Sequence, residues 1–316
     1  MNIAVLGAGA MGSLFGYKLK KDGHNVCLID IWKDHVAAVN QHGLTIETPD
    51  GATDTIPIPM VEHPEEVPAV MKEPVELIIV FVKGTATDSA IRQAACIVSK
   101  DTKVITLQNG VGNADVLAKY IPANQVYFGT TTVGATIKSA GHVIYYPAQK
   151  ETCTHIATMD GSVTAGIEAV ASAFTKAGLT TIVSSETEAL VWKKLVVNCI
   201  GNPMSVVTRL YSNVLCSDDD NTILTKQIID ESCAVAQKKG LPITPDQFDW
   251  VIPFTSKLER FPSMGYDAMN KMPTEIETIN GAVVREGKRL GVPTPVNETL
   301  YHLVRLISAH YDKRVY

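Results

Sequence analysis

The sequence predicts an α/β N-terminal domain with a mostly parallel sheet, followed by an all-helical C-terminal domain. Residues 1–183 alternate short apolar runs with helical periodicity, which is typical of parallel strands joined by crossover helices. Residues 184–316 show helical periodicity only. Because 316 residues are enough for two domains, we place the boundary between residues 183 and 184.

Composition and charge exclude several classes of partner. The chain is 46% hydrophobic and 19% charged, as in ordinary globular proteins. A formal net charge of -5 provides no cationic surface for nucleic acid or an anionic membrane. The chain begins directly in a strand pattern without a signal-peptide pattern, so we expect a cytoplasmic location. The six scattered cysteines form no C-x-x-C pair, which indicates reduced thiols and no metal site.

A glycine-rich turn, Gly7-x-Gly9-x-x-Gly12, follows an apolar run at 3–6 and opens a helical pattern that ends near Lys21. In such a turn the first glycine permits a tight bend, the second lets a pyrophosphate approach the backbone, and the third lets the helix pack on the strand. Free N–H groups at the helix start receive the phosphate charge. A purely structural turn is the alternative, but the strand–turn–helix context favours a Rossmann dinucleotide site. The residues expected there are Gly7, Ala8, Gly9, Ala10, Met11 and Gly12.

The choice of cofactor depends on Asp30, which ends the second apolar run at 26–29. A carboxylate at this place accepts both ribose hydroxyls and repels a 2′-phosphate, so NAD is favoured over NADP. Ile31 and Trp32 follow without an arginine, although Lys33 is close enough to make this a preference only. A solvated turn aspartate is the alternative interpretation.

Two further polar residues follow predicted strands. Lys83 stands after the apolar run at 77–82, and Asn109 follows the run at 104–107. Ligands of open α/β sheets bind outside the carboxyl ends of the strands, so both residues are candidates for a cofactor or substrate contact. A solvated loop lysine and a simple Asn-Gly turn are equally open.

Residues 125–183 are β-rich, with runs at 126–128, 141–146 and 180–183. We expect these strands to extend the first sheet. One helix is expected near 162–178.

The first helix of the second domain carries a polar row. Lys194, Asn198 and Asn202 recur at four-residue intervals among apolar residues, and Pro203 follows the last of them. Buried polar side chains need partners, so the row favours a cleft with a polar ligand. The alternative is a lysine that reaches solvent beside locally bonded asparagines. The asparagine spacing favours Lys194 over the neighbouring Lys193.

Two capping boxes predict where helices of this domain begin. Residues 185–188 form one, with Ser185 as the N-cap residue, and residues 274–277 form the other. The helix of the second box should end at Gly291. Glu275 would then lie in a first helical turn, where the helix dipole favours a carboxylate regardless of function.

With these residues assembled, the chain resembles the ketopantoate reductase family over nearly its whole length. The segments that carry the resemblance are Gly7–Gly12, Lys83, Gln108–Gly110, Gly129–Thr132, Trp192–Pro203, Ser263-Met264 and Thr274–Gly281. The helical segments of the second half are much more specific than the glycine motif, because their spacing is long and their residue types are unusual. The resemblance implies NAD(P)H-dependent reduction of a small 2-oxo acid, such as 2-dehydropantoate, to a D-2-hydroxy acid.

The resemblance also implies roles for single residues. Lys194 would be the general acid, donating a proton to the substrate carbonyl oxygen while hydride arrives. Glu275 would orient the ligands and keep Lys194 charged. The residues implied on the cofactor side are Lys83, Asn109 and Ala135. Those implied on the substrate side are Asn198, Asn202, Asn213 and Ser263.

Departures from the family pattern leave the substrate open. Asp30-Ile31 stands where members that use NADP place an arginine, and Val133 stands where some members carry a histidine. Arg260 lies three residues before Ser263, where an asparagine can occur in the pantoate enzymes. These departures point towards the NAD-dependent D-2-hydroxyacid dehydrogenases of the family, which act on branched or aromatic 2-oxo acids. A dinucleotide-binding regulator without turnover and a dehydrogenase of the 6-phosphogluconate type are alternatives. A homodimer is an open expectation.

Overall fold

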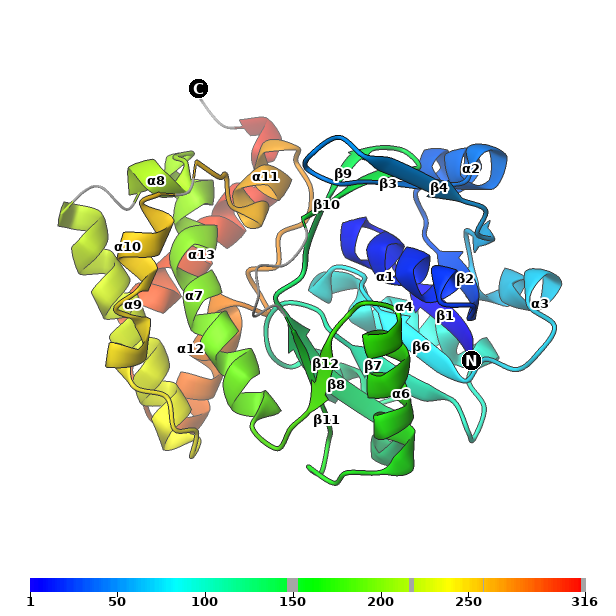
Figure 1. Ribbon diagram of the computed structural model, residues 1–316. Helices are drawn as coiled ribbons and strands as arrows, with labels where there is room; N and C mark the ends of the chain where they lie inside the picture. Colours follow the sequence, from blue (N-terminus) through cyan, green and yellow to red (C-terminus); the bar gives the residue numbers. More distant parts are fainter. Residues whose placement is uncertain (147–152, 216–218, 258, 314–316) are drawn as a thin grey trace. The chain divides into compact units, whose positions relative to one another are not determined.

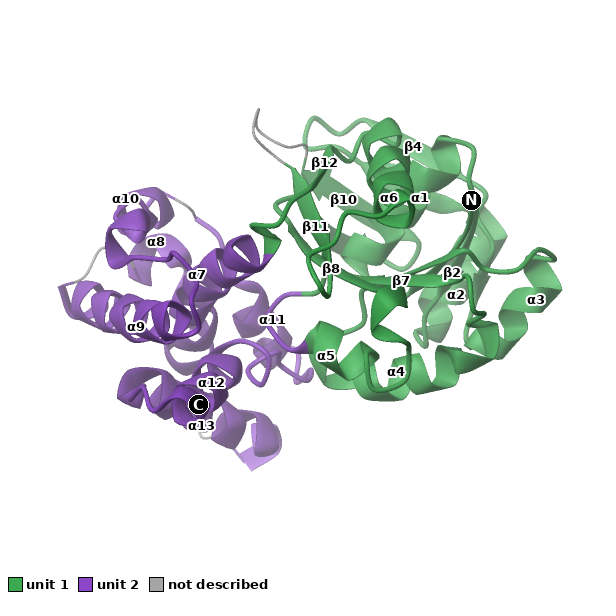
Figure 2. Cartoon of the chain, turned by 90° about the horizontal axis from the view of Figure 1, so that it is seen from below, with its two compact units in different colours: residues 1–108, 113–187 green, residues 109–112, 188–316 purple. Residues whose placement is uncertain are grey.

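The computed structural model describes residues 1–146, 153–215, 219–257 and 259–313 (Figure 1). It confirms the predicted fold class. The chain forms two compact units, residues 1–108 with 113–187 and residues 109–112 with 188–316 (Figure 2). The division after Thr187 lies four residues beyond the predicted boundary, and the short loop 109–112 is grouped with the helical unit.

The first unit contains an eight-stranded sheet in the order β12-β11-β8-β7-β6-β1-β2-β5. Its strands are β1 (Asn2–Leu6), β2 (Asn25–Ile29), β5 (Met60–Val61), β6 (Leu77–Val80), β7 (Lys103–Thr106), β8 (Val126–Thr131), β11 (Thr154–Thr158) and β12 (Thr181–Val183). Neighbouring strands are parallel except for β8 and β11. Because β1 lies between β6 and β2, the loops after these three strands meet at one edge of the sheet.

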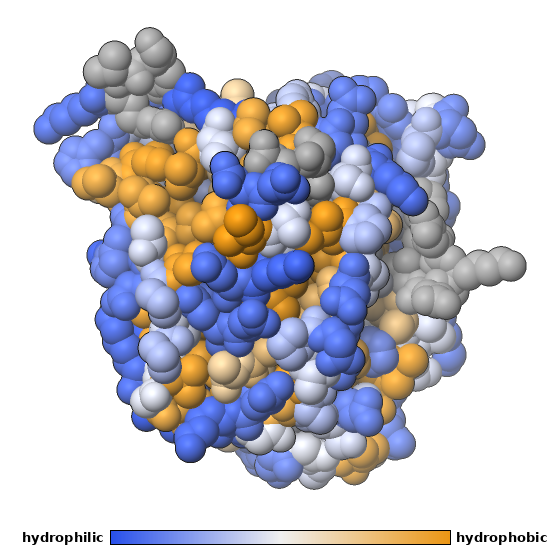
Figure 3. Space-filling model, turned by 90° about the vertical axis from the view of Figure 1, so that its left-hand side faces the viewer, coloured by the Kyte–Doolittle hydropathy of each residue, from blue (hydrophilic) through white to orange (hydrophobic). Residues whose placement is uncertain are grey.

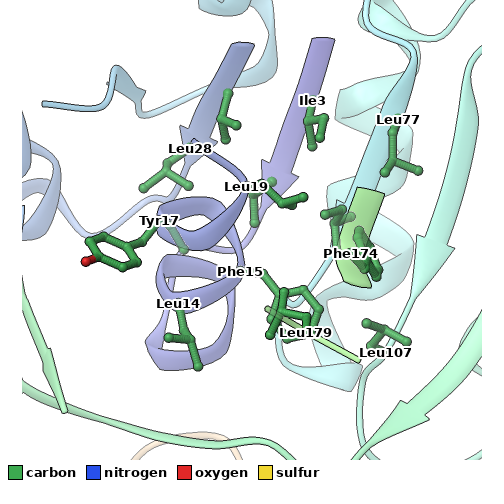
Figure 4. Close-up of a cluster of buried hydrophobic side chains, with 14 of the residues drawn as sticks. Ile3, Leu14, Phe15, Tyr17, Leu19, Leu28, Leu77, Leu107, Phe174 and Leu179 are labelled. Carbon is green, nitrogen blue, oxygen red and sulfur yellow. The ribbon is translucent and has the colours of Figure 1, made fainter. Parts of the chain in front are cut away.

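Helices cover both faces of this sheet. They are α1 (Ala10–Lys21), α2 (Lys33–His42), α3 (Val67–Val70), α4 (Thr87–Ala94), α5 (Asn113–Leu117) and α6 (Ala165–Lys176), and α6 confirms the helix predicted near 162–178. Ile3 of β1 packs with Phe15 of α1 and Phe174 of α6 (Figure 4). Its neighbour Ala4 belongs to a separate cluster with Ile91 of α4. Strands buried on both faces explain the continuous apolar runs of the sequence.

The prediction that residues 141–146 extend the first sheet is wrong. They form β10 (His142–Tyr146) in a second sheet of order β4-β3-β10-β9, with β3 (Leu44–Glu47), β4 (Thr53–Ile56) and β9 (Gly134–Ser139). A tight hairpin at Gly141, which has φ +74°, pairs β10 with β9. Within β10 only Val143 is fully buried, so the strand has one apolar face, which suits the second sheet better than the centre of a sheet covered on both sides.

The described part of the second unit consists of helices and their connections. The helices are α7 (Thr187–Thr208), α8 (Ser212–Leu215), α9 (Asp219–Lys238), α10 (Val251–Thr255), α11 (Ser263–Met269), α12 (Asn280–Leu290) and α13 (Pro295–Ala309). Their core is built around Trp192 and Leu195 of α7. No helix among the described residues is long and apolar enough to cross a membrane. Apolar side chains also reach the surface, and Figure 3 shows several apolar patches on one face of the molecule.

Both predicted helix starts in this unit are wrong. Helix α7 begins at Thr187, and the Ser184 hydroxyl accepts the backbone N–H of Glu186, which lies just before the helix. Helix α12 begins at Asn280 instead of within 274–277. In the intervening segment the Thr278 carbonyl oxygen accepts the Val111 N–H from the loop 109–112. The predicted end of α12 at Gly291, with φ +71°, is confirmed.

Candidate active site

The glycine turn joins β1 to α1 and contains two glycines that the fold itself requires. A Cβ on Gly7 would lie 2.4 Å from the Val82 backbone nitrogen, and φ is +93° there. A Cβ on Gly12 would lie 2.0 Å from the Gly7 carbonyl oxygen. Gly9 is different, since a Cβ would meet nothing within 4 Å. Folding therefore explains Gly7 and Gly12, whereas open space at Gly9 fits the close approach of a ligand.

A buried hydrogen-bond chain supports the same turn. The Ser13 hydroxyl donates to the Ala8 carbonyl oxygen at 2.7 Å and lies 3.2 Å from His35 Nε2. The Gly141 N–H donates to His35 Nδ1 at 2.8 Å, so the neutral ring carries its proton on Nε2 and donates to Ser13. Sequence reasoning did not assign a role to Ser13 or His35, because these hydrogen bonds join three elements that are far apart in sequence: α1, α2 and the β9–β10 hairpin.

The buried hydrogen bonds of His35 make the stability of the first unit sensitive to acid. Burial lowers the pKa of His35, so protonation favours the unfolded state, and the stabilisation present above about pH 6.5 is lost as pH falls. We expect the melting temperature to fall a few degrees more between pH 7.5 and pH 5 in the wild type than in His35→Gln. Scanning calorimetry of both proteins measures this difference. Parallel curves would show that His35 does not carry the effect.

The acidic candidate Asp30 lies directly after β2, beside the glycine turn. Its Oδ1 accepts the Trp32 backbone N–H at 3.0 Å, which is the local bond expected of a turn aspartate. Lys33 forms an ion pair with Glu62 at 3.8 Å. The carboxylate therefore stands at the sheet edge where a ribose contact is expected, while the nearby cation has an acidic neighbour of its own.

A side chain from the loop after β7 holds the loop after β6 in place. Gln108 Nε2 donates to the Val82 carbonyl oxygen at 2.6 Å and to the Thr87 hydroxyl at 2.8 Å. Lys83 follows Val82 and is exposed at the start of a 3-10 turn. Sequence reasoning gave Gln108 no role of its own, although its place at the end of a buried strand was the signal. Ala135 lies elsewhere, in the second sheet, partly buried opposite Tyr145.

In the helical unit the structure brings Lys194 and Glu275 together. Lys194 is a partly buried residue of α7, and Glu275, in the turn before α12, is only 8% exposed. Burial lowers the pKa of Lys194 from 10.5 to about 8, and the opposing charge of Glu275 limits the fall. A lysine with this pKa can hold and release a proton near neutral pH.

The rest of the polar row lies on the same helix. Asn202 is buried, and Asn198 is partly buried with its Nδ2 enclosed. Among the described residues, Asn198 Nδ2 has no hydrogen-bond acceptor. Because leaving a buried amide without a partner is costly, this atom points to a ligand with an acceptor oxygen.

Helix α11 brings Ser263 to the Asn202 end of the row. Pro262 lies 3.8 Å from where a Cβ of Gly201 would stand, and Gly265 packs on Ser205. Asn213 in α8 is linked to the same region, because the Ser212 N–H donates to the Arg260 carbonyl oxygen at 2.9 Å. In this conformation Asn213 Oδ1 accepts the Val214 backbone N–H.

The loop 109–112 is grouped with the helical unit and bonds the turn before α12. The Val111 N–H donates to the Thr278 carbonyl oxygen at 2.9 Å. A Cβ on Gly110 would lie 2.2 Å from that same oxygen, and φ is +89°, so only glycine fits. Asn109 thus stands next to the turn that carries Glu275.

None of the described cysteines is joined in a disulfide. The described cysteines, Cys27, Cys96, Cys153, Cys199 and Cys233, are free thiols, and Cys216 lies outside the described residues. Within the described ranges there is no group of three or more His, Cys, Asp or Glu side chains that could hold a metal ion.

Known proteins match the chain over nearly its full length. Residues 3–158 match the model "Ketopantoate reductase PanE/ApbA", and residues 186–308 match that of its C-terminal domain. The 2-dehydropantoate 2-reductase of Streptococcus pyogenes serotype M3 is 30% identical over 312 residues, 98% of each chain. D-mandelate dehydrogenase with NADH and anilino(oxo)acetate has a TM-score of 0.88 at 28% identity, covering 98% of this chain and 99% of that one. A PanE/ApbA family ketopantoate reductase from Ralstonia eutropha JMP134 has a TM-score of 0.86 at 29% identity, with the same coverage.

Proposed function

Because the chain belongs to the ketopantoate reductase PanE/ApbA family, an oxidoreductase family, we propose that it reduces a 2-oxo acid to a D-2-hydroxy acid with Lys194 as the general acid. The observation that carries this assignment is the Lys194–Glu275 pair, which combines a lysine pKa of about 8 with a buried carboxylate. A regulator that only binds a dinucleotide would have no need for such a pair.

The proposed reaction divides the work between the two units. NADH supplies the hydride when bound. In the first unit, backbone N–H groups at the start of α1 hold the pyrophosphate and Asp30 accepts the ribose hydroxyls, with Lys83 and Ala135 also on this side. In the second unit, Lys194 Nζ gives its proton to the carbonyl oxygen as that oxygen gains charge, and Glu275 keeps the ammonium form available.

The remaining polar residues are proposed to bind the substrate. Asn198 Nδ2 is the first of them, because its buried donor suits a carboxylate or hydroxyl oxygen. The others are Asn202, Asn213 and Ser263, whereas Asn109 stays on the cofactor side of the proposal. Together they would hold the 2-oxo acid with its carbonyl oxygen at Lys194, in position to accept the proton.

Two substrates of this class have separate support. Curated relatives are 2-dehydropantoate 2-reductases, which favours 2-dehydropantoate. The D-mandelate dehydrogenase fold match favours a bulkier, aromatic 2-oxo acid. Initial rates with 2-dehydropantoate, 2-oxoisocaproate and phenylglyoxylate, measured side by side at equal enzyme concentration, decide between them. NADH binding without oxidation on any of the three would contradict the proposal and favour a binding protein.

NAD preference is the finer part of the proposal. We expect NADH to give a higher kcat/KM than NADPH, because the Asp30 carboxylate repels a 2′-phosphate. Asp30→Asn removes the charge with little change in shape, so it should narrow the NADH-to-NADPH ratio by about 10-fold, which is ~1.4 kcal/mol. An unchanged ratio would show that Asp30 does not contact this part of the cofactor.

A homodimer in the cytoplasm completes the proposal. The helical unit exposes large apolar side chains, among them Tyr266, Met269 and Leu306, each more than 60% exposed. Apolar surface of this kind is typical of contacts with another protein chain. Light scattering of the purified protein measures its mass directly.

A further inference from the structure

Proline inside α7 leaves one backbone carbonyl without its helical donor. Pro203 lies within the helix and has no N–H, so the Cys199 carbonyl oxygen, four residues earlier, cannot form the usual bond. The proline ring also pushes that carbonyl outward. Cys199 stands between Asn198 and Asn202, so the defect lies in the middle of the polar row that begins at Lys194.

A side chain from another helix makes the missing bond. Asn280, the first residue of α12, donates from Nδ2 to the Cys199 carbonyl oxygen at 3.1 Å. The same Nδ2 donates to Asn297 Oδ1 of α13 at 3.0 Å. Asn280 and Asn297 are both fully buried. One amide therefore replaces, from 81 residues away in sequence, the donor that Pro203 removed.

The orientation of this amide is determined by a third residue. Glu231 of α9 accepts the backbone N–H groups of Val296 and Asn297 at 2.8 and 2.9 Å, and its Oε2 accepts Asn297 Nδ2 at 2.8 Å. An ionised carboxylate can only accept hydrogen bonds, so Asn297 donates to Glu231 from Nδ2 and turns its Oδ1 toward Asn280. Asn280 must therefore donate to Asn297 from Nδ2. Asn280 Oδ1 then has no donor in the described part of the chain, which shows that the two acceptors impose the orientation.

We propose that Asn280 is a positioning residue for the reduction. It holds α7 at the Pro203 break through the Cys199 carbonyl, and thereby sets the direction in which Lys194 and Asn198 point from the preceding turns. Asn280 does not contact the substrate in this proposal. The kinetic part rests on the proposed function, whereas the hydrogen-bond part is independent of it.

A double-mutant cycle with Pro203→Ala tests this inference. Alanine restores an N–H at position 203 that can bond the Cys199 carbonyl, so Asn280 becomes less necessary. We expect Asn280→Ala to lower kcat about 10-fold and the melting temperature by about 3–8 °C, with KM for NADH within ~2-fold of wild type. In the Pro203→Ala background the same substitution should lower kcat by only ~2- to 3-fold, with a correspondingly smaller melting shift.

The pH profile separates positioning from general loss of stability. Asn280→Ala should shift the pH at which kcat/KM falls to half its maximum, because it moves Lys194 relative to Glu275. Adding Pro203→Ala should restore that pH to the wild-type value. Asn221→Ala is the matched control, a buried asparagine of α9 with no hydrogen bond to Cys199. Its melting shift should be the same with and without Pro203→Ala.

Equal losses for Asn280→Ala in both backgrounds would overturn the inference. If Asn280→Ala does not fold, Asn280→Ser, which also lacks the long donor, replaces it in the same cycle. If the protein turns over no 2-oxo acid, the proposed function fails, but the melting cycle still decides whether Asn280 acts through the Cys199 carbonyl.

Discussion

Lys194→Ala is expected to lower kcat for 2-oxo acid reduction about 10³-fold, with a much smaller effect on the affinity for NADH. The substitution removes both the proton donor and the positive charge beside the developing alkoxide. Stopped-flow measurement of NADH oxidation gives the rate, and fluorescence titration gives the NADH affinity. Lys193→Ala is the matched control, because Lys193 is the adjacent residue of the same helix and has the same charge, and its rate should stay close to wild type.

The pH dependence gives an independent check of the same role. Lys194 has a pKa of about 8, lowered by burial and supported by Glu275. The proton donor is therefore present below about pH 8 and is lost as pH rises, so kcat/KM should fall above that value. Glu275→Gln removes the stabilising charge and should move this fall to lower pH. A Lys194→Ala rate within ~10-fold of wild type would contradict the general-acid role.

Gly9→Ala is expected to weaken NADH binding roughly 10- to 100-fold, or ~1.4–2.7 kcal/mol, while the melting temperature stays within about 2 °C of wild type. The reason is that an added methyl group meets no protein atom within 4 Å but occupies the space a pyrophosphate needs. Isothermal titration calorimetry measures the binding, and calorimetric melting measures the fold.

Gly12→Ala provides the contrast. Its methyl group would lie 2.0 Å from the Gly7 carbonyl oxygen, so this variant should lose stability before any ligand is added. If Gly9→Ala binds NADH within 2-fold of wild type, the pyrophosphate does not approach the turn at Gly9. If Gly9→Ala melts as low as Gly12→Ala, the space at Gly9 serves the fold.

Local patterns predicted much of the first unit, because its strands are buried on both faces. The apolar runs around Ile3, Ile78 and Val104 all became neighbouring strands of one sheet. The run at 141–146 was predicted to extend the first sheet, and this prediction is wrong, because a half-buried strand is equally apolar in sequence but pairs in a different sheet. The capping box at 274–277 does not begin a helix either: α12 starts at Asn280, and the Thr278 carbonyl oxygen instead accepts a bond from Val111.

By itself the sequence determined the glycine turn, the acid after the second strand and the row of Lys194, Asn198 and Asn202, because each depends on spacing within one or two elements. The family resemblance implied that Glu275 keeps Lys194 charged, but only the tertiary structure showed that the lysine is desolvated beside Glu275 and that Asn280 completes α7. Those partners lie about 80 residues away along the chain, and periodicity reports which face of an element is buried, not what it is buried against. The lowered pKa of Lys194 is likewise a tertiary property, because desolvation depends on every segment that packs around the amine.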